Sequence, residues 1–154
     1  MSVRTSAGSL IAITATAPAT FNSAGYEAGT YTAIGEITNQ GDFGREYEEV
    51  THAPLATRAT QKFKGGYNEG TMALQLGLDD DDAGQILLQA ALLSDDDYYF
   101  RVTQQDGTKR YFPAKTMSFK VSIGARNQIT GATCNLAISS SKTGVGVVTV
   151  KPTP

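Results

Sequence analysis

The chain has almost none of the residues on which many catalytic and metal sites are built. It contains one cysteine, Cys134, one histidine, His52, and no tryptophan. One cysteine cannot form an intrachain disulfide, and one histidine excludes a metal site that needs two imidazoles. A Cys–His catalytic pair would have to join these two residues, but Cys134 lies on the apolar side of a predicted strand, where an inert thiol is expected. The composition therefore argues against an enzyme.

A strong charge of either sign and a long apolar run are also missing. Thirteen Lys and Arg against fifteen Asp and Glu give a net charge of -2, which provides no reason to expect tight binding to nucleic acid or to an anionic membrane. No apolar run approaches the about 18 residues of a membrane span. The segment LIAITATA at residues 10–17 has a small-x-small end like a signal peptidase site, but Thr14 and Thr16 interrupt it. We interpret it as a first strand after an arm.

Alternation of apolar and polar residues is the clearest pattern that is present. It is sharpest in TMALQLGL, residues 71–78, which predicts a strand with one buried face. Residues 105–108, QDGT, predict the turn of a hairpin. In residues 117–123 the predicted core side carries Met117, Phe119, Val121 and Ile123. Further strands are predicted at residues 30–38, 98–103, 109–112, 133–138 and 145–150. The pattern predicts a single, mainly β domain over residues 1–154.

One helix is expected, over residues 82–93, with an apolar face made of Ile86, Leu87, Ala90 and Leu93. Aspartates precede and follow it. The first run suits the helix start, where one carboxylate caps the helix and the others lie near its positive dipole end; these candidates are Asp79, Asp80, Asp81 and Asp82. The second run is placed at the unfavourable negative end. We therefore expect Asp95, Asp96 and Asp97 to face solvent or a basic neighbouring subunit.

The aspartate run does not fit a calcium loop. With Asp79 in the first position of an EF-hand, the fifth position is Ala83 and the twelfth is Ala90, and neither has a side-chain oxygen. Catalytic carboxylates need two environments that separate their pKa values, which adjacent exposed acids lack. We expect no catalytic residue, no metal and no cofactor.

The alternation fails between residues 39 and 68, where the sequence predicts a long loop with a short strand near residues 60–63. Such a long irregular connection is uncommon in a compact domain unless it has a use. Its charges are ordered, with acids first and bases second. The loop is therefore either a mobile, solvated connection or a charged surface that contacts another molecule; the candidate residues are Glu46, Glu48, Glu49, Arg58, Lys62 and Lys64.

Residues 29–140 resemble a known family. The segment KFKGGYNEGTMALQLGLDDDDAGQILLQAALLSDDDYYFRV, followed by DG and then AKTMSFKVSIG, is similar to the major tail tube proteins of long, flexible-tailed bacteriophages. The resemblance lies in the order of strand, acidic cap, helix, DDDYYF strand and MSFK strand. It implies a two-sheet antiparallel β-sandwich or barrel with one flanking helix. It also implies a core at residues 10–140 between arms at residues 1–9 and 141–154.

The resemblance further implies a structural role in the virion. Six subunits would form a ring, and rings would stack into a tube for DNA delivery. The loop at residues 39–68 would reach the adjacent ring, and its charge order suits head-to-tail stacking in which the acids of one ring meet the bases of the next. Partners would be further copies, the tape measure, tail tip and terminator proteins, and DNA passing without specific binding, with no membrane. Assembly would take place in the cytoplasm of the bacterial host.

Two further expectations concern surfaces. Small polar strand faces suit a wet channel lining, and the candidates are Thr71, Gln75, Ser118, Lys120, Ser122, Thr133 and Asn135. The alternative function is a monomeric β-sandwich binding module of a virion, for a receptor or carbohydrate. That alternative predicts a concave aromatic patch made of Tyr26, Tyr31, Tyr47 and Tyr99.

Overall fold

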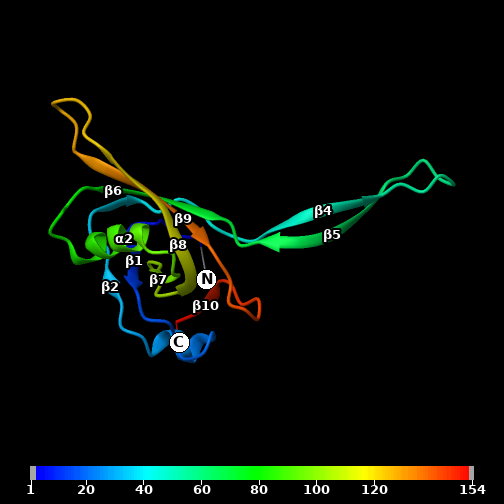
Figure 1. Cartoon of the computed structure of the whole chain (residues 1–154), viewed down its shortest axis with the longest axis horizontal. Helices are drawn as coiled ribbons and strands as arrows, with labels where there is room; N and C mark the ends of the chain where they lie inside the picture. Colours follow the sequence, from blue (N-terminus) through cyan, green and yellow to red (C-terminus); the bar gives the residue numbers. More distant parts are fainter. Residues whose placement is uncertain (1–2, 153–154) are drawn as a thin grey trace.

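The structure, a computed structural model, describes residues 3–152 and is mainly β (Figure 1). Two helices are present in that range, α1 (Ser23–Glu27) and α2 (Ala83–Leu93). The strands are β1 (Leu10–Thr14), β2 (Thr32–Ala33), β3 (Ile37–Asn39), β4 (Glu46–His52), β5 (Gln61–Asn68), β6 (Thr71–Gly77), β7 (Tyr98–Thr103), β8 (Lys109–Ser122), β9 (Gly131–Ile138) and β10 (Val148–Val150). The predicted mainly β, antiparallel class is confirmed. Neither helix has the length and apolarity to cross a membrane.

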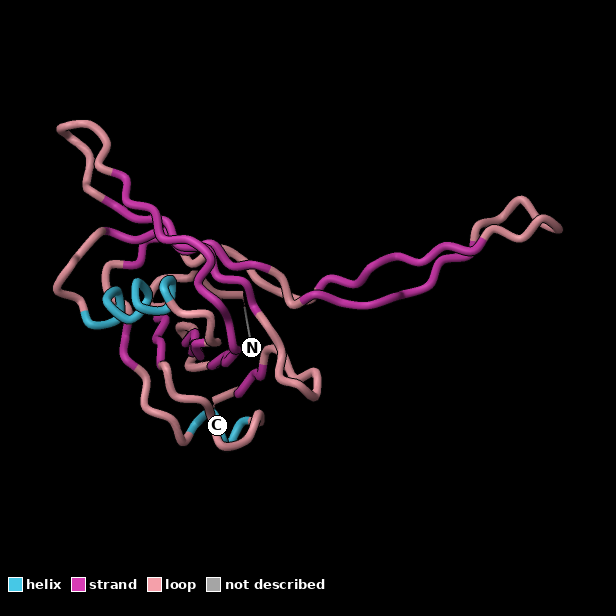
Figure 2. The backbone as a smooth tube through the Cα atoms, viewed as in Figure 1, coloured by secondary structure: helices cyan, strands magenta, loops and turns pink. Residues whose placement is uncertain are grey.

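Eight of the strands form one curled sheet, a half-barrel (Figure 2). Its order is β2-β1-β7-β8-β9-β6-β3, with β10 beside β8, while β4 and β5 form a second, two-stranded sheet. Strand β8 holds the half-barrel together. Its residues 109–114 pair with β7, and its residues 114–122 pair with β9. One continuous strand therefore joins the two parts of the curled sheet.

The core fills the concave side of this sheet. In β6 and β9, Leu74 lies opposite Cys134 and Met72 opposite Leu136, and all four are fully buried. The alternation predicted for β6 is confirmed. Burying a side chain the size of leucine contributes about 1.5–3 kcal/mol. Contacts between distant strands therefore account for most of the core's stability.

A smaller aromatic cluster covers the opposite face of β7 and β8. Tyr26, Tyr99 and Tyr111 are buried there, and the Tyr26 and Tyr111 rings stack with centroids 5.3 Å apart. Tyr26 comes from α1, whose first turn is capped by the Asn22 side chain accepting from the Gly25 N–H at 2.8 Å. This second helix was not predicted, because five residues are too few to show helical periodicity. The cluster makes β7 apolar on both faces.

The predicted core side of residues 117–123 is wrong at Met117, Val121 and Ile123, which are 62%, 50% and 67% exposed. Val121 and Ile123 are uncovered because the end of β8 and the loop after it project beyond the core (Figure 1). The pairing of β8 with β9 shifts register between Thr116 and Ser118. A β-bulge at this point leaves one residue unpaired and changes which residues face inward. Before the bulge Thr116 is buried, and after it Phe119 packs against the core. Simple alternation cannot reveal such an insertion.

The bounds of α2 match the prediction, but its predicted buried face is right only at Leu87, which is partly buried against the core, whereas Ala90 is exposed. The buried residues are Gly84, Gln85, Leu88 and Ala91. Ile86 and Leu93 are 51% and 89% exposed. Gly84 explains this rotation, because any side chain there would overlap the backbone of Ala33 and Ile34. The helix therefore presents its smallest residue, rather than its most apolar stripe, to the sheet.

The predicted long loop at residues 39–68 is also wrong. Most of it is the β4–β5 hairpin, which projects far from the curled sheet (Figure 1). The predicted short strand near residues 60–63 is the start of β5, while β4 and the rest of β5 were missed because charged and glycine residues replace the usual apolar alternation. The irregular parts are the short approach at residues 40–45 and the tip at residues 53–60.

The two predicted arms are partly attached to the sheet. Arg4 forms an ion pair with Asp106 at 3.1 Å. In the C-terminal arm, β10 pairs with β8 through Val148 opposite Tyr111. Residues 1–2 and 153–154 of these arms lie outside the described residues.

Candidate assembly surfaces

The β4–β5 hairpin brings the predicted acidic and basic residues side by side. Glu49 lies opposite Lys64, and the Lys62 ammonium is 3.6 Å from the Glu49 carboxylate. Lys64 also lies over the ring of Tyr47, 4.9 Å from its centroid. Some of the charge that was expected to pair only between rings is thus paired within one hairpin. Both members of the Glu49–Lys62 pair are more than half exposed, so its contribution to stability is small.

The same hairpin has no core on either face. None of the β4 and β5 residues is buried. Val50 and Phe63 lie opposite each other and are 51% and 56% exposed. At the tip, Leu55 is fully exposed. An isolated two-stranded hairpin is marginally stable in water. This hairpin therefore has the character of an element that is covered by another molecule.

An ion pair holds the base of the hairpin. The Arg45 guanidinium donates from Nε and one terminal nitrogen to Glu69 Oε1 at 3.0 and 2.8 Å. Glu69 is buried, and Gly146 packs against its carboxylate without room for a side chain. Arg45 also stacks on the Tyr67 ring at 3.9 Å. Sequence reasoning missed this pair, because its two residues are 24 positions apart and flank strands that were not predicted.

The predicted channel-lining residues share one face of the sheet. Register places Gln75 opposite Thr133, and Asn135 opposite Ser118. Lys120 lies on this face, opposite Thr133. Arg101 lies beside the aromatic cluster, with its guanidinium carbon 5.1 Å from the ring centroid of Tyr31. The full set on the shared face is Thr71, Gln75, Ser118, Lys120, Ser122, Thr133 and Asn135. Their role in lining a channel stays a prediction.

Of the four aspartates before α2, Asp82 is the N-cap. Its Oδ2 accepts from the Gln85 N–H and from the Gly35 N–H, both at 3.0 Å. One carboxylate thus starts the helix and attaches it to the loop before β3. Asp79 accepts from the Asp81 N–H at 3.1 Å, which shapes the turn. Asp79, Asp80 and Asp81 themselves remain exposed.

Gln85 is a structural residue that the sequence did not indicate. Its side chain is fully buried, and its amide donates to the carbonyl oxygens of Gly35 and Gly77 at 3.1 and 3.0 Å. Its Oε1 accepts from the Asp79 N–H at 3.0 Å. The sequence hints at this role only through a polar residue within an apolar helix pattern. That hint does not identify the residues to which Gln85 is hydrogen-bonded.

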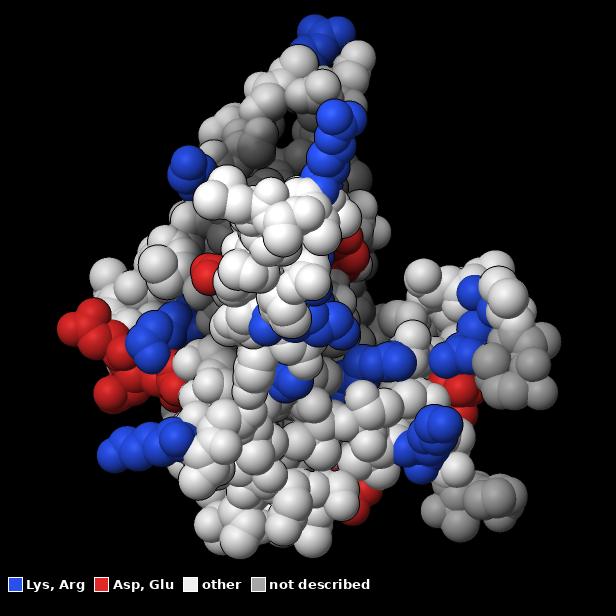
Figure 3. All heavy atoms as spheres, turned by 90° about the vertical axis from the view of Figure 1, so that its right-hand side faces the viewer, with Lys and Arg blue, Asp and Glu red and all other residues white. Residues whose placement is uncertain are grey.

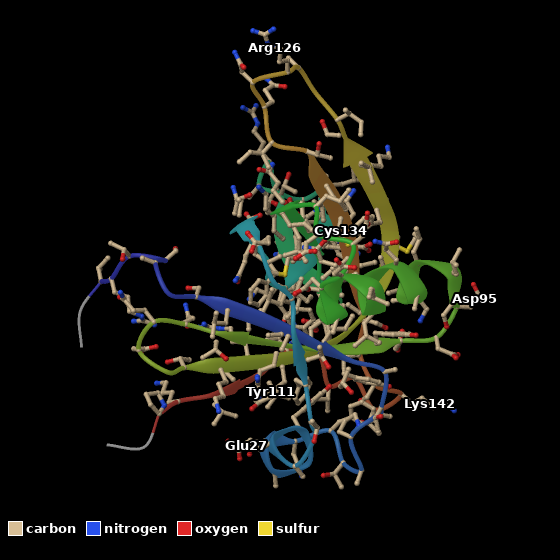
Figure 4. All side chains as sticks on the ribbon, turned by 90° about the vertical axis from the view of Figure 1, so that its left-hand side faces the viewer. Glu27, Asp95, Tyr111, Arg126, Cys134 and Lys142 are labelled. Carbon is tan, nitrogen blue, oxygen red and sulfur yellow. The ribbon has the colours of Figure 1, made fainter. Side chains whose placement is uncertain are left out.

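The second aspartate run is divided by the structure. Asp97 pairs with Lys115 of β8 in the same chain. Asp95 and Asp96 are exposed, and Figure 4 shows Asp95 pointing outward beyond the end of α2. Ser94 Oγ accepts from the Asp96 N–H at 3.1 Å, which fixes the turn. Asp95 and Asp96 thus remain candidates for contact with a neighbouring subunit.

The geometry disfavours the catalytic and ligand-binding alternatives. Cys134 is buried in the curled sheet, and burial raises the pKa of its thiol to about 12. His52 lies in the other sheet, on exposed β4. Within residues 3–152 no three His, Cys, Asp or Glu side chains gather into a possible metal site. The expected aromatic patch is wrong, because Tyr26 and Tyr99 are buried in the core of the aromatic cluster.

Solved structures of phage-like tails share this fold. The tail of an empty gene transfer agent particle, computed with C6 symmetry, has a TM-score of 0.67 at 12% identity, over 98% of this chain and 100% of that chain. The SPP1 tail tube has a TM-score of 0.61 at 12% identity, over 95% of this chain and 78% of that chain. The fold is that of tail tube proteins.

The tail tube fold extends to a contractile system. The baseplate of the anti-feeding prophage, 6-fold symmetrised, matches with a TM-score of 0.66 and 11% identity, over 98% of this chain and 97% of that chain. No protein-family model matches the chain, and no curated protein matches its sequence. The likeness is therefore carried by the tail tube fold and not by residue identity.

Proposed function

We propose that this chain is the subunit of a tail tube, in which six copies form a ring and rings stack end to end. The observation that carries the proposal is the projecting hairpin without a buried residue, on a tail tube fold. The C6 and 6-fold symmetry of two structural neighbours supports six copies per ring. A hairpin that contacts a different surface of the next copy makes a heterologous contact, which propagates into a filament.

Passage of DNA through the tube is supported by the shared face of the curled sheet. Its predicted lining residues are small and polar, with Lys120 as the one cation among them. Each phosphate contact by Lys or Arg adds affinity through counterion release. A lining with few such contacts lets DNA pass without being held.

The same proposal includes partners and location. The tube would end at terminator, tape measure and tail tip proteins, assemble in the host cytoplasm and remain in the virion. A sheath/tube terminator and a tube terminating cap are among the structural neighbours, with TM-scores of 0.64 and 0.58. We infer a structural and not a catalytic role, because these neighbours are components of tails and injection systems.

Negative-stain electron microscopy of the purified chain tests the proposal. We expect six-fold rings or tubes that lengthen with protein concentration. A monomer at every concentration, by sedimentation, would contradict the tube and favour a binding module.

A charge variant of the hairpin sharpens this test. Replacing Glu46, Glu48 and Glu49 together by Lys is expected to prevent stacking, because the hairpin loses its acids and gains three cations. Far-ultraviolet circular dichroism should stay unchanged, since all three side chains are exposed. The matched control replaces the same residues by Gln, which removes charge and keeps shape. Normal tubes from the Lys variant would show that hairpin charge is not used.

A further inference from the structure

An apolar stripe on α2 is exposed to solvent. Ile86 and Leu93 are 51% and 89% exposed, Ala90 between them is exposed, and the three follow the i, i+4, i+7 spacing of one helix side. Acids lie at both ends of the stripe. Residues 79–97 contain Asp79, Asp80, Asp81, Asp82, Asp95, Asp96 and Asp97 and no Lys or Arg. Within residues 3–152, Asp97 is the only one of these acids that forms an ion pair, and its partner is Lys115. The surface is thus an apolar strip with an acidic border.

The outer part of the hairpin has the opposite character. Residues 50–64 contain Arg58, Lys62 and Lys64 and no Asp or Glu, although Lys62 also pairs with Glu49 just before this range. The apolar side chains in this part are Val50, Phe63 and Leu55, all at least half exposed. Figure 3 looks toward the hairpin end and shows Lys and Arg side chains spread over this face, with fewer Asp and Glu side chains between them. This surface is an apolar strip with a basic border.

The two surfaces cannot meet within one chain. The hairpin projects from the side of the curled sheet that lies away from α2 (Figure 1). Figure 4, which looks from the α2 side, shows Asp95 at the outer limit of that side. We propose that the outer hairpin of one copy, residues 50–64, docks on the α2 stripe of a second copy. The proposal rests on the proposed function and names the surface that receives the hairpin.

The apolar strips and the charged borders contribute differently to the proposed contact, because they differ in how much water they lose on docking. Phe63 and Leu93 can lose most of their contact with water, so the apolar strips supply the affinity. The charged borders stay near solvent, where they guide orientation and association rate more than affinity. Their effect falls as salt screens charges more than about 10 Å apart at 0.1 M ionic strength.

Disulfide cross-linking tests the contact in the whole chain. The variant Phe63→Cys with Leu93→Cys places one thiol on each surface, and both positions are exposed in the folded chain. Cys134 does not compete, because it is buried and its thiol is protonated at pH 8. Each copy then carries one thiol on its hairpin and one on its α2 stripe, so it can be linked to two other copies. Mild oxidation should give a ladder of dimer, trimer and larger species on non-reducing gels, whereas each single-cysteine variant should stop at dimer or monomer.

The matched control pairs Phe63→Cys with Met117→Cys, because Met117 is also exposed but lies on the β8 bulge. It should give at least tenfold less material above dimer than the Leu93 pair, about the ratio expected for a residue outside the contact. Tubes or rings in the microscope with no ladder from the Leu93 pair would overturn the docking site and leave the proposed function standing. A sample that neither assembles nor cross-links would overturn both.

A charge exchange gives a second, independent reading. One variant carries Asp95→Lys with Asp96→Lys, and the other carries Lys62→Glu with Lys64→Glu. Each alone should form tubes poorly, because like charges meet at the contact. Their mixture should assemble, since each hairpin then faces an opposite border on the other variant. Absence of recovery in the mixture would contradict the proposed pairing of borders.

Discussion

Two antiparallel strand pairs of nearly equal length differ in burial. They are β6 with β9 in the curled sheet and β4 with β5 in the hairpin. In the first pair every second residue is buried, and Leu74 and Cys134 face each other without contact with water. In the second pair no residue is buried. Hydrogen-bonded pairing is common to both, so pairing does not explain the difference. The difference lies in what covers the faces of each pair.

This contrast shows where the free energy of each region originates. The curled sheet stabilises itself by burying apolar area. The hairpin shows cross-strand contacts such as the Tyr47–Tyr67 ring pair, with centroids 5.5 Å apart, which are individually weak. The chain thus folds its own core, and in our proposal a second copy covers the hairpin.

The largest predicted effect compares phenylalanines from the two regions. Phe112→Ala should lower the free energy of unfolding by about 3–5 kcal/mol, because Phe112 is fully buried and stacks on Phe100. Phe63→Ala should change it by less than about 0.5 kcal/mol and should reduce assembly instead. Urea titration measures the first effect, and sedimentation measures the second. An equal loss of stability in both variants would remove the distinction between the regions.

A smaller effect is predicted for glycines. Gly84→Ala should destabilise the chain by about 1–3 kcal/mol through overpacking, since its Cβ would lie 2.5 Å from the Cα of Ile34. Gly66→Ala in β5 is the control, because a Cβ there meets nothing within 4 Å. Thermal unfolding of the two variants provides the measurement. A Gly84→Ala protein as stable as the Gly66→Ala protein would mean that α2 can move away from β2 at little cost.

The smallest predicted effect is a loss of stability at alkaline pH, caused by the aromatic cluster that covers one face of the curled sheet. Burial raises the pKa of Tyr31 to about 12, and burial also raises that of Tyr26. Both phenols stay protonated in the folded chain, while in the unfolded chain they ionise near their ordinary value of 10. Stability is therefore full below about pH 10 and falls as pH rises toward 12.

The variant Tyr26→Phe should lose less stability over this interval. It removes one of these phenols, and the buried Tyr26 hydroxyl has no hydrogen-bond partner within residues 3–152. Tyr47→Phe, in the exposed hairpin, should keep the native slope of stability against pH. Unfolding titrations at pH 9, 10 and 11 give the slopes. Identical slopes for all three proteins would show that the aromatic cluster does not cause the alkaline loss.

Local pattern was sufficient to predict the elements of the core. Strict alternation marked β6, and an acidic run before an apolar segment marked the start of α2, where Asp82 is the N-cap. Both signals depend on neighbours a few residues away. The sequence of the hairpin, EYEEVTH and QKFKGGYN, lacks alternation because neither face meets a core. Apolar–polar alternation reveals strands with one buried face, so it did not reveal these exposed strands.

The features that escaped prediction depend on distant residues. Gln85 reaches Gly35, 50 positions away, and the Met117 bulge exists only against β9. The orientation of α2 was also wrong because the space beside Ala33 admits only Gly84. The candidate surfaces follow the same rule. Their residue types were visible in the sequence, but their grouping required the register of the sheet.

The Arg45–Glu69 ion pair fixes the angle at which the β4–β5 hairpin leaves the curled sheet, and a small change in this angle moves the far end of the hairpin much further than its base. At about 3.3 Å per residue, the seven residues of β4 reach about 23 Å from that base. A tilt of about 5° at the base would shift the far end by about 2 Å, enough to separate atoms from van der Waals contact. In the proposed docking, the position of Phe63 on the second copy therefore depends on an ion pair at the base of the hairpin, which that copy need not touch.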